Sequence, residues 1–159
     1  MFTILDTILC SQPSSDVVFV HDATGSQKPY LDSARDFVRK RITTYRDRVT
    51  SPASVRFRVV AFRDHREQGD KWMIDDSQPF VTSSGDVERQ LRRLVASGGG
   101  DGPEAQLDAL DAVHRSAWRS KAARIVIMIT DSAPHGIKEP GDVVPASHPK
   151  GENTFYHCF

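Results

Sequence analysis

The chain has 159 residues, and its 21 Lys and Arg residues are balanced by 21 Asp and Glu residues, so the formal net charge is zero. A single domain of this length can bury a sizeable core without disulfide or metal staples. A neutral chain has no net field to attract nucleic acid or an anionic membrane surface, so we expect neither as a partner.

Signals for the cellular compartment are few. Cys10 and Cys158 are too few for a disulfide framework and lack the spacing of zinc ligands; they could pair if the chain ends meet, and otherwise they are free thiols in a reducing compartment. The first ten residues are apolar but include Asp6 and have no basic leader, unlike a signal peptide. No run approaches the roughly 18 apolar residues of a membrane span. We therefore expect a cytoplasmic protein.

An apolar run at residues 16–21 predicts a strand buried on both faces, and it ends in a cluster of oxygen-bearing side chains. Asp22, Thr24 and Ser26 alternate with the small residues Ala23 and Gly25, which allow a tight turn. Hard oxygen donors suit Mg²⁺ or Mn²⁺. The alternative is that Thr24 and Ser26 cap the following helix, since Ser and Thr are favoured at that position.

The next segments alternate between helical and strand patterns. Apolar residues three and four apart predict an amphipathic helix over 31–49, followed by a strand at 55–62 that stops at Arg63-Asp64-His65. Pro79 opens a short segment to residue 82 that could be an edge strand. A helix capped by residues 83–86 follows and ends at the glycines 98–100; its apolar stripe consists of Val87, Leu91, Leu94 and Val95.

The last third of the chain contains one further helix and one long strand. Residues 101–104 predict a helix start with Pro103 in its first position, and the expected inner face consists of Leu107, Leu110, Val113 and Ala117. A continuous apolar run over 124–129 then predicts a strand that ends at Thr130-Asp131. Residues 137–154 are polar and rich in Pro and Gly, and 155–159 could form one short strand.

This order of elements predicts an α/β fold with an open, mostly parallel sheet. Ligands of such sheets bind outside the carboxyl ends of the strands. Asp22, Asp64, His65 and Asp131 all follow predicted strands, and the glycine loop precedes a helix on the same side. A shared cation is the simplest reason for acids to gather there, because confined carboxylates otherwise repel each other or take up protons.

Three motifs together resemble a von Willebrand factor type A domain: D-A-T-G-S after the first strand, G-G-G-D-G-P-E-A before a helix, and I-T-D followed by A-P-H-G. The resemblance implies a three-layer, Rossmann-like sheet with helices on both faces. It also implies a metal-ion-dependent adhesion site with ligands, direct or through water, at Asp22, Thr24, Ser26 and Asp131. The A-F-R-D-H segment and the A-P-H-G ending are similar to the branch attached to alpha-type kinases.

Two departures from the family pattern matter. The second loop has Gly102 where a Thr is usual, with Asp101 beside it as the replacement donor. The added negative charge would make the cation a weaker acceptor for an acidic partner. We place Asp64, His65 and Gly102 in the surroundings of the metal. The sheet also looks incomplete at its C-terminal end, so we expect an extension at 1–15, the domain at 16–136 and an irregular tail at 137–159.

The leading hypothesis is a non-enzymatic interaction module whose Mg²⁺ or Mn²⁺ keeps an open position for an acidic side chain of a partner protein. One rival is a Mg²⁺-dependent phosphohydrolase with Asp22 as nucleophile, although such enzymes have a second acid where this chain has Thr24. No Walker loop or Gly-x-Ser-x-Gly elbow is present, and His21, His65 and His135 match no zinc motif. A degenerate domain that binds nothing is the third hypothesis.

Overall fold

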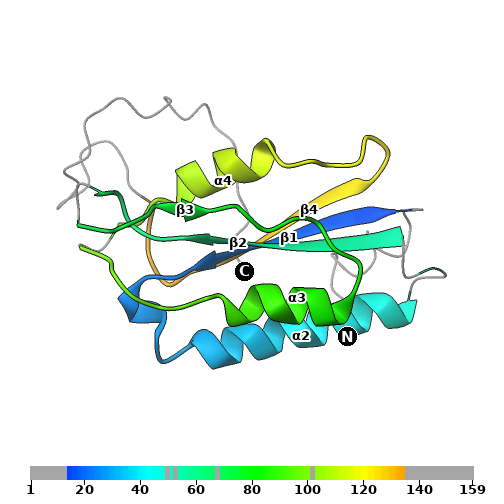
Figure 1. Ribbon diagram of the computed structural model, residues 1–159, viewed down its shortest axis with the longest axis horizontal. Helices are drawn as coiled ribbons and strands as arrows, with labels where there is room; N and C mark the ends of the chain where they lie inside the picture. The colour runs from blue at the N-terminus through cyan, green and yellow to red at the C-terminus, as the bar shows by residue number, and fades with distance from the viewer. Residues whose placement is uncertain (1–13, 49–50, 52–53, 67–68, 101–102, 135–159) are drawn as a thin grey trace.

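The computed structural model describes residues 14–48, 51, 54–66, 69–100 and 103–134. They form one open sheet with strand order β3-β2-β1-β4, in which β1 is parallel to both neighbours and β3 is antiparallel to β2. Two helices cover one face and one covers the other (Figure 1). The predicted three-layer, mostly parallel α/β architecture is thus confirmed. The elements are β1 (Ser15–Asp22), α2 (Leu31–Arg48), β2 (Val55–Phe62), β3 (Ile74–Asp75), α3 (Ser84–Arg92), α4 (Gln106–His114) and β4 (Ala123–Ile129).

The central strand β1 is buried along its whole length, as its continuous apolar run predicts. Successive side chains of a strand point to opposite faces. Val17 and Phe19 therefore join the core under α2 and α3, whereas Val18 and Val20 join a second core under α4. Both faces of β1 are thus closed to water, and the ends of this strand are where polar side chains can act.

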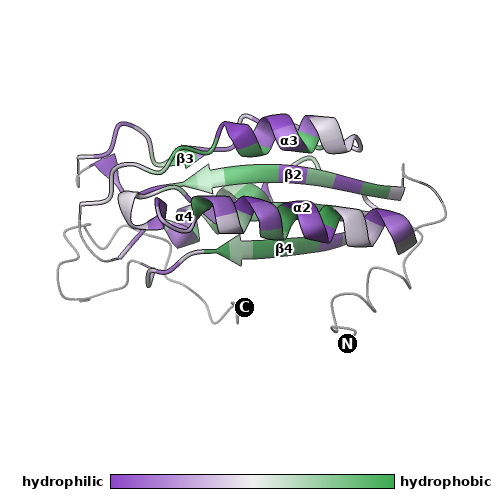
Figure 2. Cartoon of the chain, turned by 90° about the horizontal axis from the view of Figure 1, so that it is seen from below, coloured by the Kyte–Doolittle hydropathy of each residue, from purple (hydrophilic) through white to green (hydrophobic). Residues whose placement is uncertain are grey.

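Helix α2 has the amphipathic pattern expected from its sequence. Ala34, Val38, Ile42 and Tyr45 are buried in the predicted stripe, and the Tyr45 ring stacks on Phe57 with a centroid distance of 6.4 Å. Most exposed residues of the helix are charged or polar, and hydrophilic and hydrophobic segments alternate along it (Figure 2). Burial of this stripe fixes α2 across the sheet and positions the loop that precedes it.

The edge strand lies earlier in the chain than predicted. The expected strand at residues 79–82 is wrong, because only Val81 forms an isolated bridge, to Phe57, and the paired strand is β3. The backbone of Pro79 cannot donate to a ladder. The Pro79 carbonyl instead accepts a hydrogen bond from the Gln90 side chain at 2.8 Å.

Helix α4 also differs from its prediction. It begins at Gln106 rather than Pro103, because Glu104 pairs with Pro134 in a parallel bridge. Its buried residues include Ala109 and Val113, whereas Leu107 is 40% exposed. Small residues on the buried side let the helix approach the sheet closely. Leu107 and Ala117 were therefore wrongly assigned to the core, as was Val95, which lies beyond the end of α3 and is 61% exposed.

The remaining expectations concern residues outside the described part of the chain. These are the N-terminal extension through residue 13, both cysteines, Val49 and the tail with its possible strand at 155–159. Of the helices in the described part, none is both long and apolar enough to cross a membrane.

Candidate metal centre at the carboxyl edge of the sheet

The loop after β1 is organised around the fully buried carboxylate of Asp22. Its Oδ1 accepts hydrogen bonds from the Thr24 backbone N–H at 2.9 Å and from the Thr24 hydroxyl at 2.7 Å. Thr24 precedes the short 3-10 helix η1 (Gly25–Gln27), but its side chain makes no capping hydrogen bond. Of the two interpretations of Thr24, the structure therefore does not support capping.

Hydrogen bonds link this loop to the end of β4. The Thr24 and Ser26 hydroxyl oxygens are 3.2 Å apart, and the Ser26 hydroxyl donates to Asp131 Oδ1 at 3.1 Å. The Thr130 hydroxyl donates to Asp22 Oδ2 at 2.8 Å. The structure thus brings together Asp22, Thr24, Ser26 and Asp131, although two loops about a hundred residues apart supply them. Their role as metal ligands stays a prediction.

The glycine-rich segment after α3 lies against the same edge. Gly98 and Gly99 have φ angles of 80° and 85°, a region that side chains with a Cβ rarely adopt. This conformation points the Gly99 N–H at Asp70 Oδ2 (2.9 Å) and the Gly100 N–H at Asp64 Oδ2 (3.2 Å). Asp64, predicted to surround the metal, is therefore buried at the site beside Asp70.

Glu104 is a further acid of this centre. Its side chain is 3% exposed, and among the described residues its Oε2 has no hydrogen-bond partner. A Cβ added to Gly99 would lie 3.2 Å from Thr24 Cβ and 3.3 Å from Glu104 Oε1, so these residues are immediate neighbours. Burial, followed by the negative charges of Asp22 and Asp64, raises the pKa of Glu104 to about 8.

Sequence reasoning missed Glu104. It stands where a helix was expected to start, and an acid in the first turn of a helix has an ordinary explanation in the helix dipole. In the structure its backbone N–H donates to the Ala133 carbonyl at 3.0 Å, and this hydrogen bond holds Glu104 against the loop after β4. The available signal was an acid directly after a glycine-rich loop at the edge where the other acids gather.

The other predicted residues contribute differently. Asp101 and Gly102 lie outside the described residues. The buried His65 has its Nε2 3.5 Å from Asp108 Oδ2, so its ring is directed toward α4. His21 is fully buried, its Nδ1 contacts the Asp22 carbonyl, and burial lowers the pKa of its imidazole. Both histidines are packed into the fold.

The donor set of this centre consists of carboxylates and hydroxyls, with the guanidinium of Arg63 beside Asp70. The nearby guanidinium of Arg63 is buried, but it donates to the carbonyls of Ala23 (3.1 Å) and Val95 (2.8 Å) and stays 3.8 Å from Asp70. A hard cation such as Mg²⁺ fits this donor set of carboxylates and hydroxyls. In the described part of the chain, no three His, Cys, Asp or Glu residues form a metal cluster by themselves. A cation here would therefore depend on the Thr24 and Ser26 hydroxyls.

Comparison with known proteins agrees with this architecture. The model of the von Willebrand factor type A domain matches residues 16–155. The chain belongs to this family. The predicted resemblance to this family is thereby confirmed, and the match extends past residue 136, where the domain was expected to end.

One relative connects this von Willebrand factor type A domain to the kinase branch. The alpha-protein kinase vwkA of Dictyostelium discoideum is 26% identical over 138 residues, which is 86% of this chain but 21% of the relative. The predicted similarity to the branch associated with alpha-type kinases is therefore confirmed. Because the chain spans only about a fifth of that protein, the comparison concerns the domain alone.

Proposed function

We propose that this domain is a non-enzymatic interaction module that binds Mg²⁺ or Mn²⁺ and, through the metal, an acidic side chain of a partner protein. Membership of a family that often mediates protein interactions supports the coarser part of this proposal. One observation supports the metal: side-chain oxygens of Asp22, Thr24, Ser26 and Asp131 follow one another at distances of 2.7, 3.2 and 3.1 Å at the carboxyl edge of the sheet.

The charges at the site support the same proposal. Asp22, Asp64 and Glu104 are all buried there, and the pKa of Glu104 is raised to about 8 by burial and by the charges of the two aspartates. A protein that needed these acids only for folding would gain from neutralising them. A divalent cation would relieve their repulsion, and Asp22, Thr24 and Ser26 would hold it with Asp131 nearby.

Glu104 modifies the prediction about the second loop. The family Thr is absent at Gly102, but Glu104 brings a buried carboxylate to the site from the same loop. A carboxylate holds a divalent cation more strongly than a hydroxyl does, yet it also leaves the cation less electrophilic toward a second acid. We therefore propose tight metal binding combined with modest affinity for the acidic partner.

The first test measures metal binding by thermal unfolding. A ligand that binds only the native state adds about 2.7 kcal/mol when its concentration is 100 times its Kd. Mg²⁺ should therefore raise the Tm by several degrees, and Asp22→Ala should abolish the rise. Asp32→Ala is the matched control, because Asp32 is an exposed acid of α2 and its loss should leave the rise unchanged.

The outcomes separate the three hypotheses. No change of Tm or heat of binding with Mg²⁺ or Mn²⁺ in the intact protein would contradict the metal site and favour a degenerate domain. Mg²⁺-dependent hydrolysis of an aryl phosphate that disappears in Asp22→Asn would instead favour the phosphohydrolase. If the metal binds, EDTA-reversible capture of a partner by the wild type but not by Asp22→Ala supports recognition through the metal.

A further inference from the structure

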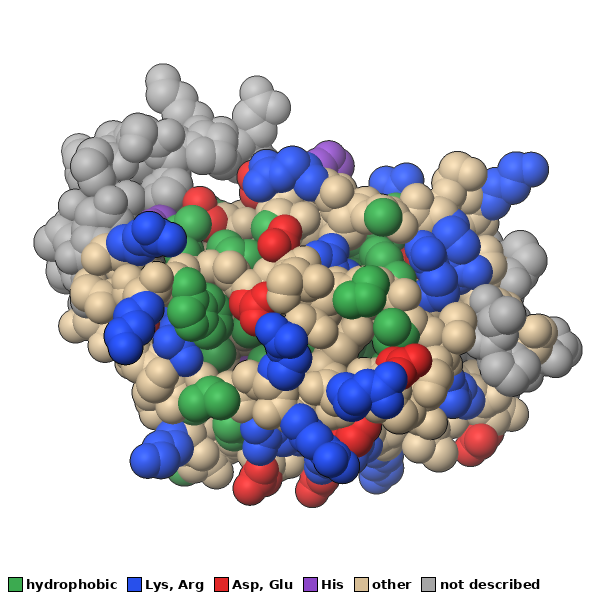
Figure 3. Space-filling view, in the orientation of Figure 1, with side chains coloured by type: hydrophobic (Ala, Val, Ile, Leu, Met, Phe, Trp, Pro, Cys, Tyr) green, Lys and Arg blue, Asp and Glu red, His purple; other side chains and the backbone are tan. Residues whose placement is uncertain are grey.

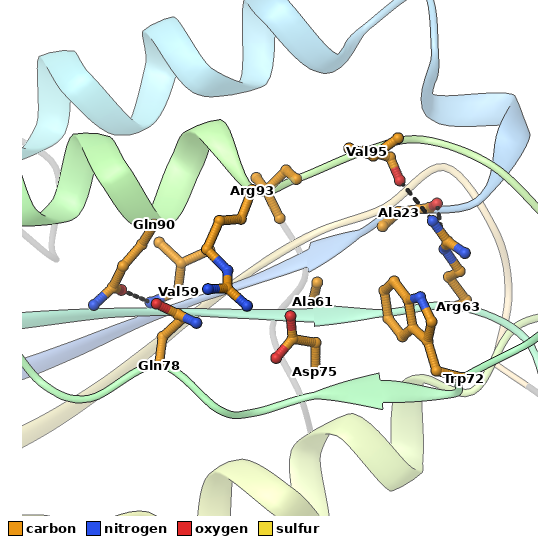
Figure 4. Close-up of a pocket in the computed structure, with 11 residues that line it drawn as sticks. Ala23, Val59, Ala61, Arg63, Trp72, Asp75, Gln78, Gln90, Arg93 and Val95 are labelled. Atoms are coloured by element: carbon orange, nitrogen blue, oxygen red, sulfur yellow. Dashed lines mark hydrogen bonds between the residues drawn. The ribbon is translucent and has the colours of Figure 1, made fainter.

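A cavity of about 230 Å³ lies between β2 and the C-terminal part of α3, and Ala23 and the carboxylate-bearing Asp75 are among the residues that line it. Ala61 and Val59 of β2 line its floor, and the ring of Trp72 forms a wall (Figure 4). The Arg63 guanidinium lies 4.1 Å from the Trp72 ring centroid and fixes that wall in place. The side chain of Arg93, the first residue after α3, extends over the cavity.

The cavity continues into a second hollow of about 540 Å³ between α3 and the chain at residues 78–81. Gln78, Gln90 and Arg93 line both hollows, so together they form one groove along the edge of the sheet, here named the α3 groove. Lys and Arg side chains are spread over the face of the molecule shown in Figure 3, with apolar side chains between them.

The α3 groove is positive although the chain as a whole is neutral. Arg89 and Arg92 already have acidic neighbours on their own helix, Asp86 and Glu88. Arg93 forms no ion pair or side-chain hydrogen bond among the described residues, and it stands where the two hollows meet. The arginines that line the groove are Arg63, Arg89, Arg92 and Arg93, against the acids Asp75 and Asp86.

The size and chemistry of the groove define its occupant. The inner cavity of about 230 Å³ suits a single amino-acid side chain, and the adjoining hollow of about 540 Å³ leaves room for the peptide segment that carries it. The backbone here is not free for strand addition, because the carbonyls of Gln78 and Pro79 accept hydrogen bonds from Arg58 (2.6 Å) and Gln90 (2.8 Å). The groove therefore offers side chains, not a backbone ladder.

We propose that the α3 groove docks a short acidic peptide segment of a partner protein. One apolar side chain of the segment enters the cavity over Ala61 beside Trp72, and an adjacent carboxylate pairs with Arg93. This site needs no metal, so it is independent of the adhesion-type site at Asp22. It would give the domain a second acidic contact on the same partner or on another one.

The test uses the intact protein in EDTA, so that the metal site does not contribute. The probe is a pool of synthetic octapeptides with two Asp or Glu residues beside one Leu, Met or Phe, and the control pool has Asn and Gln in place of the acids. In ¹H–¹⁵N spectra the acidic pool should shift the indole signal of Trp72. The indole of Trp118 should not shift, because it lies on the other face and donates to the Val113 carbonyl.

Arg93→Glu should weaken binding of the acidic pool at least tenfold, which corresponds to about 1.4 kcal/mol. Arg115→Ala is the matched control, since Arg115 follows α4 on the opposite face. Absence of any Trp72 shift, equal binding of both pools, or unchanged binding by Arg93→Glu would each overturn the proposal. Metal-dependent binding that Asp22→Ala abolishes would not support it, because that result belongs to the other site.

Discussion

The two ends of β1 each hold a fully buried aspartate, and the fold surrounds them in opposite ways. At the amino end, Asp16 accepts two hydrogen bonds from Arg56 (2.9 and 2.7 Å) and others from the backbone and side chain of Arg119 (2.8 and 2.9 Å). At the carboxyl end, the hydrogen bonds that the described residues donate to Asp22 come from neutral groups of Thr24 and Thr130. Asp16 thus faces two guanidinium groups, whereas Asp22 faces hydroxyls and a backbone N–H.

This difference is accompanied by opposite pKa shifts at the two ends of the strand. Burial alone would raise the pKa of Asp16, but the hydrogen bonds from Arg56 and Arg119 outweigh it and hold the pKa below its usual value. At the other end, burial, followed by the charges of Asp22 and Asp64, raises the pKa of Glu104 to about 8. A group of buried acids that share no cation lowers stability. We therefore expect the stability of the carboxyl end, unlike that of the amino end, to depend on a cation.

The largest expected effect is at the amino end. Asp16→Asn should lower the free energy of unfolding by about 3 kcal/mol, because it leaves two arginines without their shared buried partner. The loss should be the same with and without Mg²⁺ in urea unfolding. Asp32→Ala should change stability by less than about 0.5 kcal/mol. A Mg²⁺-dependent loss in Asp16→Asn would break the distinction between the two ends.

The next prediction concerns Glu104 at the carboxyl end, where a substitution should raise the free energy of unfolding instead of lowering it. Its folded pKa of about 8 lies above the unfolded value of 4.5, so the native state holds the proton more strongly. Stability from this group is complete below about pH 4.5 and is lost as the pH rises to about 8. Glu104→Gln should remove that decline and raise stability at pH 8 by on the order of 2 kcal/mol without metal.

The metal provides a second readout for Glu104. A divalent cation should displace its proton, so Mg²⁺ should stabilise the wild type more at pH 8 than at pH 5.5. In Glu104→Gln this dependence on pH should be much weaker. If wild type and variant have the same stability–pH curve without metal, Glu104 is not held against the other acids as the structure indicates.

The sequence was sufficient for the elements whose signal is local. β1, β2 and β4 were predicted from apolar runs that end in an acid, and α2 from its stripe through Val38, Ile42 and Tyr45. From these, the rule for parallel sheets places Asp22 and Asp131 at one edge. The proximity of Asp22, Thr24, Ser26 and Asp131 could thus be predicted, because each strand has its own local signal, an apolar run followed by oxygen-bearing side chains.

The errors occur where a distant segment decides the outcome. Glu104 lies outside helix α4 because it pairs with Pro134, thirty residues away. Nothing in the sequence around Glu104 indicates this contact. Leu107 is exposed because α4 packs on the sheet through Ala109 and Val113 instead. Which residues of α4 are buried depends on how closely this helix approaches β2. The arginines that neutralise Asp16 are equally remote: Arg56 lies beside it only because of the register between β1 and β2.

The smallest effect on stability should come from the rim of the centre. Ser26 and Asp131 are exposed, and the Ser26 hydroxyl donates to Asp131 at 3.1 Å. Because exposed residues contribute little to stability, Ser26→Ala and Asp131→Asn should each change the free energy of unfolding by less than about 0.5 kcal/mol. Because we propose Ser26 and Asp131 as ligands or supports of ligands, each substitution should nonetheless weaken Mg²⁺ binding about tenfold in calorimetric titration. Ser84, an exposed residue of α3, provides the control, since Ser84→Ala should leave Mg²⁺ binding nearly unchanged. Wild-type Mg²⁺ affinity in Ser26→Ala and Asp131→Asn would contradict a role of Ser26 and Asp131 in the site.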